Sequence, residues 1–293
     1  MNWHQLQFFT HGDDAEHLGD LLFAIGAASV TFQDGGDEPI YEPSADQLLT
    51  WQETVVTALF NEAMDIDECL ESLGLLWGKK LPHYQQSQLA DKDWENEWKR
   101  YFKPVKFGND LWICPSWCEP PEPAATNIIL DPGLAFGTGT HPTTAMCLEQ
   151  LSLMTLTNKT VIDYGCGSGI LGIAAHKRGA AQVIGVDNHP QALEASLDNA
   201  AKNNINPEQF VIVAPDALPD AQADVLVANI LAQPLVGLAA RFAELVKPDG
   251  KIILSGILHD QLPLIQQAYS PWFSLEETHS EGDWVCLVYL FSH

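Results

Sequence analysis

A glycine-rich segment, Asp163-Tyr164-Gly165-Cys166-Gly167-Ser168-Gly169, follows a short apolar run that predicts a β-strand over residues 161–164. Glycines at such a position let the backbone turn sharply and approach a ligand, and the N-terminus of a following helix attracts an anion. A dinucleotide fingerprint requires glycine at position 170, where this chain has Ile170. The spacing favours S-adenosylmethionine, whose methionine carboxylate would be the anion and whose contacts would include Gly165 and Gly167. A tight strand–helix turn without a ligand is the alternative.

Asp187 ends a second apolar run, Val183-Ile184-Gly185-Val186, about 20 residues beyond the glycine loop. A carboxylate at the end of the neighbouring parallel strand can accept hydrogen bonds from both hydroxyls of a ribose. Because Pro190 predicts a helix start close behind it, Asp187 is also a candidate for the N-cap of that helix. Asp216, near the end of a third predicted strand, is a further candidate for contact with an adenine amino group.

Asn229 ends the apolar run over residues 224–228 and begins the motif Asn229-Ile230-Leu231-Ala232. The end of this strand is where amino-methylating enzymes hold the acceptor. An amide carbonyl can accept an N–H bond and direct the nitrogen lone pair at a methyl group. A lysine with a pKa of about 10.4 must also lose a proton first, which a carbonyl does not explain. Capping of the following helix is the alternative role for Asn229.

Residues 130–144 are too polar and too rich in glycine for a buried element, yet they lie just before the first predicted strand of the glycine-loop region. A loop of this composition could fold over a bound cofactor. Phe136 would then provide an apolar contact, and Thr144 would donate its hydroxyl. A flexible surface loop is the alternative interpretation of the same composition.

The elements that must position these residues alternate regularly from residue 161 onward. This βαβα order predicts a parallel sheet with helices on both faces. Two apolar runs at the end of the chain flank Glu281-Gly282-Asp283, which predicts an antiparallel hairpin. A parallel sheet ended by such a hairpin is typical of the seven-stranded methyltransferase fold. The strands are expected at 161–164, 182–186, 210–213, 224–228 and 251–255, and the helices at 170–177, 190–203 and 234–246, with a turn at 247–250.

Residues 1–90 predict a smaller α+β domain of the order βαββαβ, a ferredoxin-like plan. Alternating residues predict strands over 3–8, 28–33, 51–60 and 84–89, and helical spacing appears over 15–25 and 65–75. A charged and aromatic segment, residues 91–103, predicts a helix that Pro104 ends. A further strand is expected over 111–114, and the proline-rich residues 119–123 predict an exposed connection. A domain boundary is therefore expected between residues 90 and 120.

The composition is that of a chain with an ordinary core and a strongly negative charge. The 293 residues are 46% hydrophobic and carry a formal charge of −25. That charge disfavours a nucleic-acid substrate and would attract a basic partner, although solubility or the habitat of the source explains it equally well. The N-terminus has no signal-peptide pattern, and no apolar run has the length of a membrane span, so we expect a cytoplasmic protein. The six cysteines and ten histidines lack the spacing of a metal site, so no metal is expected.

Three motifs together resemble one known family. Residues 131–144, Asp131-Pro132-Gly133-Leu134-Ala135-Phe136-Gly137-Thr138-Gly139-Thr140-His141-Pro142-Thr143-Thr144, are similar to the signature of the PrmA family, the methyltransferases that modify ribosomal protein L-eleven. The segment from Val161 to Gly169 and the motif Asn229-Ile230-Leu231-Ala232 match its later motifs in order. The resemblance covers essentially the whole chain, is most specific over residues 92–260, and is looser over residues 1–90 and in the last predicted strands.

The resemblance implies an activity and a separate role for each domain. It implies transfer of methyl groups from S-adenosylmethionine to lysine side chains and to the N-terminal amine of that ribosomal protein. It also implies a substrate-recognition domain at 1–90, a linker helix at 91–104 and a catalytic domain at 105–293. Family cofactor positions correspond here to Thr144, Gly165, Asp187 and Asn229. Ala232 stands where adenine and glutamine methyltransferases have an aromatic residue, so the acceptor is not held by a ring at that position.

Three hypotheses of function therefore differ in substrate or in kind. The first is a monomeric protein-lysine methyltransferase acting on the ribosomal protein, and the second is a methyltransferase acting on RNA or on a small molecule. The third is a binding module that uses the cofactor pocket without turnover. The negative charge opposes RNA, but it does not oppose a small amine. A measurement of S-adenosylmethionine binding tests the first two hypotheses, because both require that the protein binds this cofactor.

Overall fold

The computed structural model describes residues 3–36, 51–89, 99, 102–131, 139, 141–219 and 221–292. Contacts within the chain divide it into two compact units, Met1–Tyr101 and Phe102–His293. The first unit has one hydrophobic core, and the second unit has two that lie on opposite faces of its main sheet. No helix in the described ranges is both long enough and apolar enough to cross a membrane.

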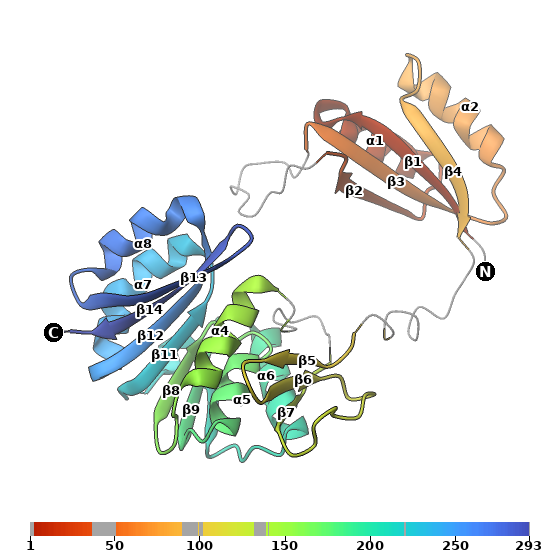
Figure 1. The fold of residues 1–293 in the computed structure, drawn as a ribbon. Helices are drawn as coiled ribbons and strands as arrows, with labels where there is room; N and C mark the ends of the chain where they lie inside the picture. Colours follow the sequence, from red (N-terminus) through yellow and green to blue (C-terminus); the bar gives the residue numbers. More distant parts are fainter. Residues whose placement is uncertain are drawn as a thin grey trace. The chain divides into compact units, whose positions relative to one another are not determined.

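In its described residues, the first unit is a four-stranded antiparallel sheet with two helices (Figure 1). Leu6 and Phe8 alternate with more exposed residues, and they pack with Leu22 and Leu73 of the helices in the core. The strand order is β2-β3-β1-β4, which confirms the predicted ferredoxin-like plan. The elements are β1 (Trp3–His11), α1 (Gly12–Ala24), β2 (Ser29–Asp34), β3 (Glu53–Asn61), α2 (Ile66–Trp77) and β4 (His83–Leu89).

The second unit is built on a seven-stranded sheet (Figure 1). Its order is β10-β9-β8-β11-β12-β14-β13, in which the first five strands are parallel. Strand β14 runs antiparallel to both β12 and β13, so the predicted terminal hairpin is confirmed. The strands are β8 (Thr160–Tyr164), β9 (Gln182–Val186), β10 (Phe210–Val213), β11 (Ala223–Asn229), β12 (Val246–Leu258), β13 (Phe273–Glu281) and β14 (Trp284–Phe291).

Helices cover both faces of this sheet. Successive residues of β8, Val161 and Ile162, belong to different cores, because neighbouring side chains of a strand point to opposite faces. The first core includes residues of α4, α5 and α6, and the second includes residues of α7 and α8. The helices are α4 (Pro142–Leu153), α5 (Ile170–Lys177), α6 (Pro190–Lys202), α7 (Ala232–Leu245) and α8 (Leu262–Tyr269), with short 3₁₀ turns η2 (Pro215–Ala217) and η3 (His259–Gln261).

A small three-stranded sheet precedes α4. It consists of β5 (Val105–Phe107), β6 (Leu111–Cys114) and β7 (Thr126–Ile129), of which the sequence predicted only β6. Arg178, which follows α5, holds this sheet in place. Its guanidinium donates to both carboxylate oxygens of Asp110 at 2.8 Å and to the carbonyl oxygen of Ser152 at 2.7 Å.

Three expectations from the sequence need correction. The turn expected at 247–250 lies inside β12, where the pairing with β11 shifts in register and Asp249 has a φ of 59°. The segment 130–144 is not a loop throughout, because α4 begins at Pro142 and includes Thr144. Helices α4 and α8 were not expected at all. The helix expected over 91–103 lies almost entirely outside the described residues.

Candidate functional site

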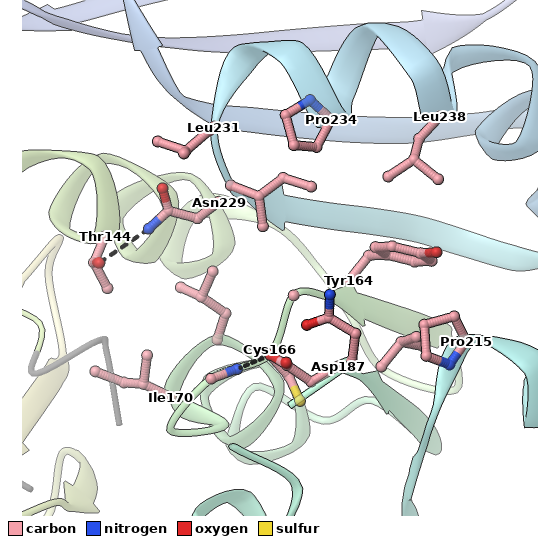
Figure 2. A pocket seen from close by; sticks show the side chains of 16 residues that line it. Thr144, Tyr164, Cys166, Ile170, Asp187, Pro215, Asn229, Leu231, Pro234 and Leu238 are labelled. Atoms are coloured by element: carbon pink, nitrogen blue, oxygen red, sulfur yellow. Dashed lines mark hydrogen bonds between the residues drawn. The ribbon is translucent and has the colours of Figure 1, made fainter. Parts of the chain in front are cut away.

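A cavity of about 460 Å³ lies at the carboxyl ends of β8, β9 and β11 (Figure 2). Side chains and backbone from the glycine loop, α4, α5 and α7 form its walls. The carboxyl edge of a parallel sheet is where ligands bind in open α/β folds. Six predicted site residues lie within the described ranges, and all of them except Asp216 line this cavity: Thr144, Gly165, Gly167, Asp187 and Asn229.

The glycine loop follows β8 and is attached to β9. The N–H groups of Gly165 and Cys166 both donate to the carbonyl oxygen of Val186, at 2.7 and 3.0 Å. Gly165 has a φ of 78°, and a Cβ atom at this residue would overlap Cγ2 of Ile230. Glycine is therefore required here both for the backbone conformation and for the close approach of the segment after β11.

Asp187 joins the glycine loop to the start of α6. Its Oδ2 accepts a hydrogen bond from the N–H of Gly167 at 2.9 Å, and its Oδ1 accepts one from the N–H of His189 at 2.9 Å. Each carboxylate oxygen has a second lone pair, so both can still accept a bond from a ligand hydroxyl. The alternative role as a helix cap is realised only in part, because His189 is itself the N-cap residue.

Asn229 at the end of β11 is held by Thr144 of α4. Its Nδ2 donates to the hydroxyl oxygen of Thr144 at 3.0 Å, and its oxygen points away from that residue (Figure 2). Thr144 is 1% exposed, so its hydroxyl is a fixed partner. The N-cap of α7 is Leu231, which makes no side-chain capping bond, so Asn229 does not cap that helix. Its amide faces the cavity instead.

The structure corrects the predicted placement of Thr144. We expected this residue in a loop, whereas it lies in the first turn of α4, and its hydroxyl oxygen accepts a hydrogen bond from Nδ2 of Asn229. Phe136 lies outside the described residues. Gly139 is described and buried, and a Cβ atom at this residue would lie 3.2 Å from Cδ1 of Ile170, which lines the cavity. The predicted segment therefore touches the cavity wall at this residue.

The cavity also has an apolar wall that the sequence did not predict. This wall is formed by Pro234 and Leu238 of α7 and by the ring of Tyr164 at the end of β8. The ring of Tyr164 packs edge-on against Phe242 of α7 at 5.0 Å between centroids. Burial raises the pKa of the Tyr164 hydroxyl, and the charge of Arg241 partly opposes that rise. Only the apolar periodicity of α7 marked this wall, and that pattern does not distinguish a cavity wall from a core face.

Pro215 also lines the cavity, whereas Asp216 does not. The exposed carboxylate of Asp216 lies in η2 directly after Pro215.

Asp163 lies beneath the glycine loop with no exposed surface. Its Oδ2 accepts a hydrogen bond from the N–H of Gly172 in the first turn of α5 at 2.8 Å. Its Oδ1 is buried and has no hydrogen-bond partner among the described residues. Burial raises the pKa of this carboxyl to about 7, and the nearby charge of Asp187 adds to the rise. A protonated Asp163 is therefore well populated at neutral pH.

Metal-ligating side chains do not gather in the described part of the chain. No group of three or more His, Cys, Asp or Glu side chains there could hold a metal ion. All six cysteines are free thiols. The polar groups that line the cavity are backbone amides, the carboxylate of Asp187, the carboxamides of Asn188 and Asn229 and the hydroxyl of Thr144, beside apolar surface.

The sheet order, the terminal hairpin and the cavity define a methyltransferase of the class that uses S-adenosylmethionine. An ordinary dinucleotide-binding domain lacks the hairpin. The glycine loop departs from the dinucleotide fingerprint at Ile170.

Comparison with known proteins identifies the family. The sequence model of the family described as Ribosomal protein L11 methyltransferase (PrmA) matches residues 2–291. A ribosomal protein L11 methyltransferase from Marinobacter nauticus is 48% identical over 292 residues, which covers 98% of each chain. Another from Shewanella frigidimarina is 51% identical over 287 residues, which covers 97% of each chain. The chain therefore belongs to the ribosomal protein L11 methyltransferase (PrmA) family, as its motifs predicted.

A solved structure supports the assignment. The crystal structure of a ribosomal protein L11 methylase from Lactobacillus delbrueckii subsp. bulgaricus has a TM-score of 0.60 and 35% sequence identity. It covers 66% of this chain and 100% of that chain. The chain is thus an enzyme, a methyltransferase.

Proposed function

We propose that this enzyme transfers methyl groups from S-adenosylmethionine to amino groups of ribosomal protein L11, at lysine side chains and at the N-terminal amine. One observation carries the proposal: the glycine loop, Asp187 and Asn229 line a single cavity in a chain of the PrmA family. In this proposal the ribose hydroxyls bind Asp187 and the methionine carboxylate binds at the start of α5. The reactive methyl group then faces Asn229.

Asn229 acts on the acceptor amine. Its Nδ2 is engaged by Thr144, and in the part of the chain that the structure describes no group donates to its Oδ1. That carbonyl oxygen can accept an N–H of the amine, which directs the nitrogen lone pair at the sulfonium methyl. Pro234 and Leu238 give this cavity an apolar wall, and contact with apolar surface favours the neutral form of an amine.

The substrate assignment rests on the relatives and on charge. Relatives of about 50% identity are named ribosomal protein L11 methyltransferase, and the charge of −25 suits a basic protein better than a nucleic acid. We assign residues 1–90 to substrate recognition, residues 91–104 to a linker helix and residues 105–293 to catalysis. The enzyme acts as a cytoplasmic monomer on a protein, and RNA or a small amine is the alternative class of substrate.

The direct test is methylation with labelled S-adenosylmethionine. The enzyme is incubated with purified L11, with the other large-subunit proteins and with ribosomal RNA, and modified residues are mapped by mass spectrometry. We expect label on amino groups of L11 alone. Label only in RNA, or label nowhere, contradicts the proposal. Asn229→Ala should abolish labelling, whereas Asn206→Ala, which changes an exposed amide of a surface turn, should not.

A deletion tests the recognition domain separately. The apolar cores of the two units share no residue, so residues 105–293 should fold without residues 1–90. The truncated enzyme should bind S-adenosylmethionine with unchanged affinity and lose methylation of L11. Normal methylation by the truncated enzyme would contradict the assignment of residues 1–90.

A further inference from the structure

Helix α6 carries a row of buried polar side chains on one face. Ser196 and Asn199 of α6 and Asn203, the C-cap residue directly after it, follow one another at intervals of three and four residues, which places them on the same side of the helix. They are 0%, 8% and 3% exposed. Buried polar groups of this kind require hydrogen-bond partners, and the partners show what the row holds.

The first two members hold the glycine loop. The hydroxyl of Ser196 donates to the carbonyl oxygen of Gly167 at 2.9 Å, and Nδ2 of Asn199 donates to the carbonyl oxygen of Ser168 at 2.9 Å. The next residue, Gly169, lies directly against Ser196, because a Cβ atom there would be 3.0 Å from the Ser196 hydroxyl oxygen. Three successive residues of the loop therefore rest on one face of α6.

Asn203 anchors the row at its other end. Its Nδ2 donates to the carbonyl oxygens of Ile129 and Asn199 at 2.8 and 2.9 Å. Its Oδ1 accepts from the N–H of Ile129 at 2.9 Å. The side chain thus pairs with both backbone groups of the last residue of β7. The small sheet consequently braces the part of α6 that supports the loop.

Helix α5 begins immediately after the supported residues. Ile170 and Leu171 are its first two residues and line the cavity, and the N–H groups of a first helical turn have no partner within the helix. The third N–H, that of Gly172, donates to Asp163. Within the described part of the chain, the N–H groups of Ile170 and Leu171 donate no hydrogen bond to another protein group. These two groups can therefore serve an anion.

We infer that Ser196 and Asn199 are positioning residues for the donor: by fixing residues 167–169 they direct the N–H groups of Ile170 and Leu171 at its methionine carboxylate. This inference rests on the proposed function, since the donor is S-adenosylmethionine. Neither residue lines the cavity, so each acts on the donor through the loop. If Ser196 and Asn199 only stabilised the fold, their loss would weaken binding of the adenosine part and of the methionine part of the donor equally. Ser196 and Asn199 instead affect the binding of the carboxylate alone.

The test compares two ligands that differ only in that group, S-adenosylmethionine and decarboxylated S-adenosylmethionine. Calorimetry gives the dissociation constant of each for the wild type, Ser196→Ala and Asn199→Leu. We expect each variant to bind S-adenosylmethionine roughly five- to tenfold more weakly, the effect of one misdirected hydrogen bond. The decarboxylated ligand should change by less than about twofold, since it makes no use of those amides. Both substitutions leave the net charge unchanged, so long-range electrostatics cannot produce the difference.

Ile205→Ala is the matched control for lost stability. Ile205 lies just beyond α6 and is 6% exposed, and its side chain belongs to the apolar core that includes Ala200 of α6. This variant should lower the melting temperature without changing either dissociation constant. At saturating S-adenosylmethionine, Ser196→Ala and Asn199→Leu should retain a kcat within about twofold of wild type, while KM for the donor rises.

The possible results separate the two claims. Equal weakening of both ligands, or unchanged binding of S-adenosylmethionine, would overturn the inference and leave the proposed function intact. A wild-type enzyme that binds neither ligand would overturn the proposed function itself. If Asn199→Leu does not fold, Ser196→Ala gives the same comparison with the loss of one oxygen atom.

Discussion

Asn229 and Thr144 are 85 positions apart in sequence, and their side chains are joined by a hydrogen bond of 3.0 Å. The first ends a central strand of the sheet, and the second lies in the first turn of α4. Because the hydroxyl engages Nδ2, the rotation of the amide is restricted and Oδ1 remains for the acceptor. The hydroxyl thus acts on the acceptor part of the site through Asn229.

Thr144→Val tests this relationship, because valine keeps the volume of threonine and removes the hydroxyl. Loss of one hydrogen bond of about 0.5–1.5 kcal/mol should lower kcat by roughly three- to tenfold. The dissociation constant of S-adenosylmethionine should change by less than about twofold, since the donor loses no direct partner. Steady-state kinetics with L11 and calorimetry with the donor provide both numbers. Thr144→Ser keeps the hydroxyl and should retain most of the activity; equal damage in both variants would show that the hydrogen bond to Asn229 alone does not account for the loss.

Asp187→Ala should weaken donor binding by roughly 1–3 kcal/mol, the usual effect of losing hydrogen bonds to a charged group. The structure adds a second cause, because the carboxylate also holds the N–H groups of Gly167 and His189. Calorimetry with S-adenosylmethionine measures the change.

Asp187→Asn separates the two causes. Its remaining oxygen can keep one of the two backbone bonds, while the charge that receives the ribose hydroxyls is lost. An intermediate loss of affinity is expected. Full wild-type affinity in both variants would mean that Asp187 only shapes the entry of α6.

Local patterns predicted much of the sheet and the cofactor half of the site. The glycine loop, the strand ends at Asp187 and Asn229 and the helix start at Pro190 are each encoded within a few residues. The carboxyl ends of parallel strands meet at one edge, so the order of these motifs implied their proximity. The predicted bounds of α5 and of β9 and β10 agree with the structure to the residue.

The remaining features depend on contacts between distant segments, which a local pattern does not record. The polar sequence around Thr144 looked like a loop, but His141 accepts the N–H of Thr143 and starts a helix there. The turn expected after α7 is absorbed into β12, because β11 pairs with residues on both sides of it. The apolar wall formed by α7 and the polar row on α6 are likewise visible only once the helices are packed.

Gly256 of β12 lies against the backbone of Ile230, the residue that follows Asn229. It has a φ of 83°, and a Cβ atom at this residue would overlap the backbone carbonyl of Ile230. Gly256→Ala should therefore displace Ile230 and its neighbour Asn229. We expect a fall in kcat of at least about tenfold and a loss of stability of roughly 1–3 kcal/mol, measured by kinetics and by urea unfolding. Gly237→Ala is the control, because nothing lies within 4 Å of a Cβ atom at that position in α7. It should keep full activity and gain about 0.5–1 kcal/mol of stability.

Asp163 should make the stability of the enzyme depend on pH in an identifiable window. Burial raises the pKa of its carboxyl from 3.8 to about 7 in the folded state. The folded protein therefore binds a proton that the unfolded chain has lost, and stability falls as pH rises from about 4 to about 7. A difference of roughly three between the pKa values of Asp163 in the folded and unfolded states corresponds to about 4 kcal/mol in the free energy of unfolding. Above pH 7 both states are ionised and the dependence ends.

Asp163→Asn isolates this contribution from those of the other carboxylates. Asparagine has nearly the same shape, and its oxygen can accept the N–H of Gly172 without ever becoming charged. Urea unfolding of both proteins at intervals between pH 4 and pH 8 gives the difference in their free energies of unfolding. The free energy of unfolding of the variant, relative to that of the wild type, should increase steadily up to about pH 7 and stay constant above it. A difference that is flat from pH 4 upward would mean that Asp163 is ionised in the folded protein throughout, and that the first turn of α5 is held by a full negative charge.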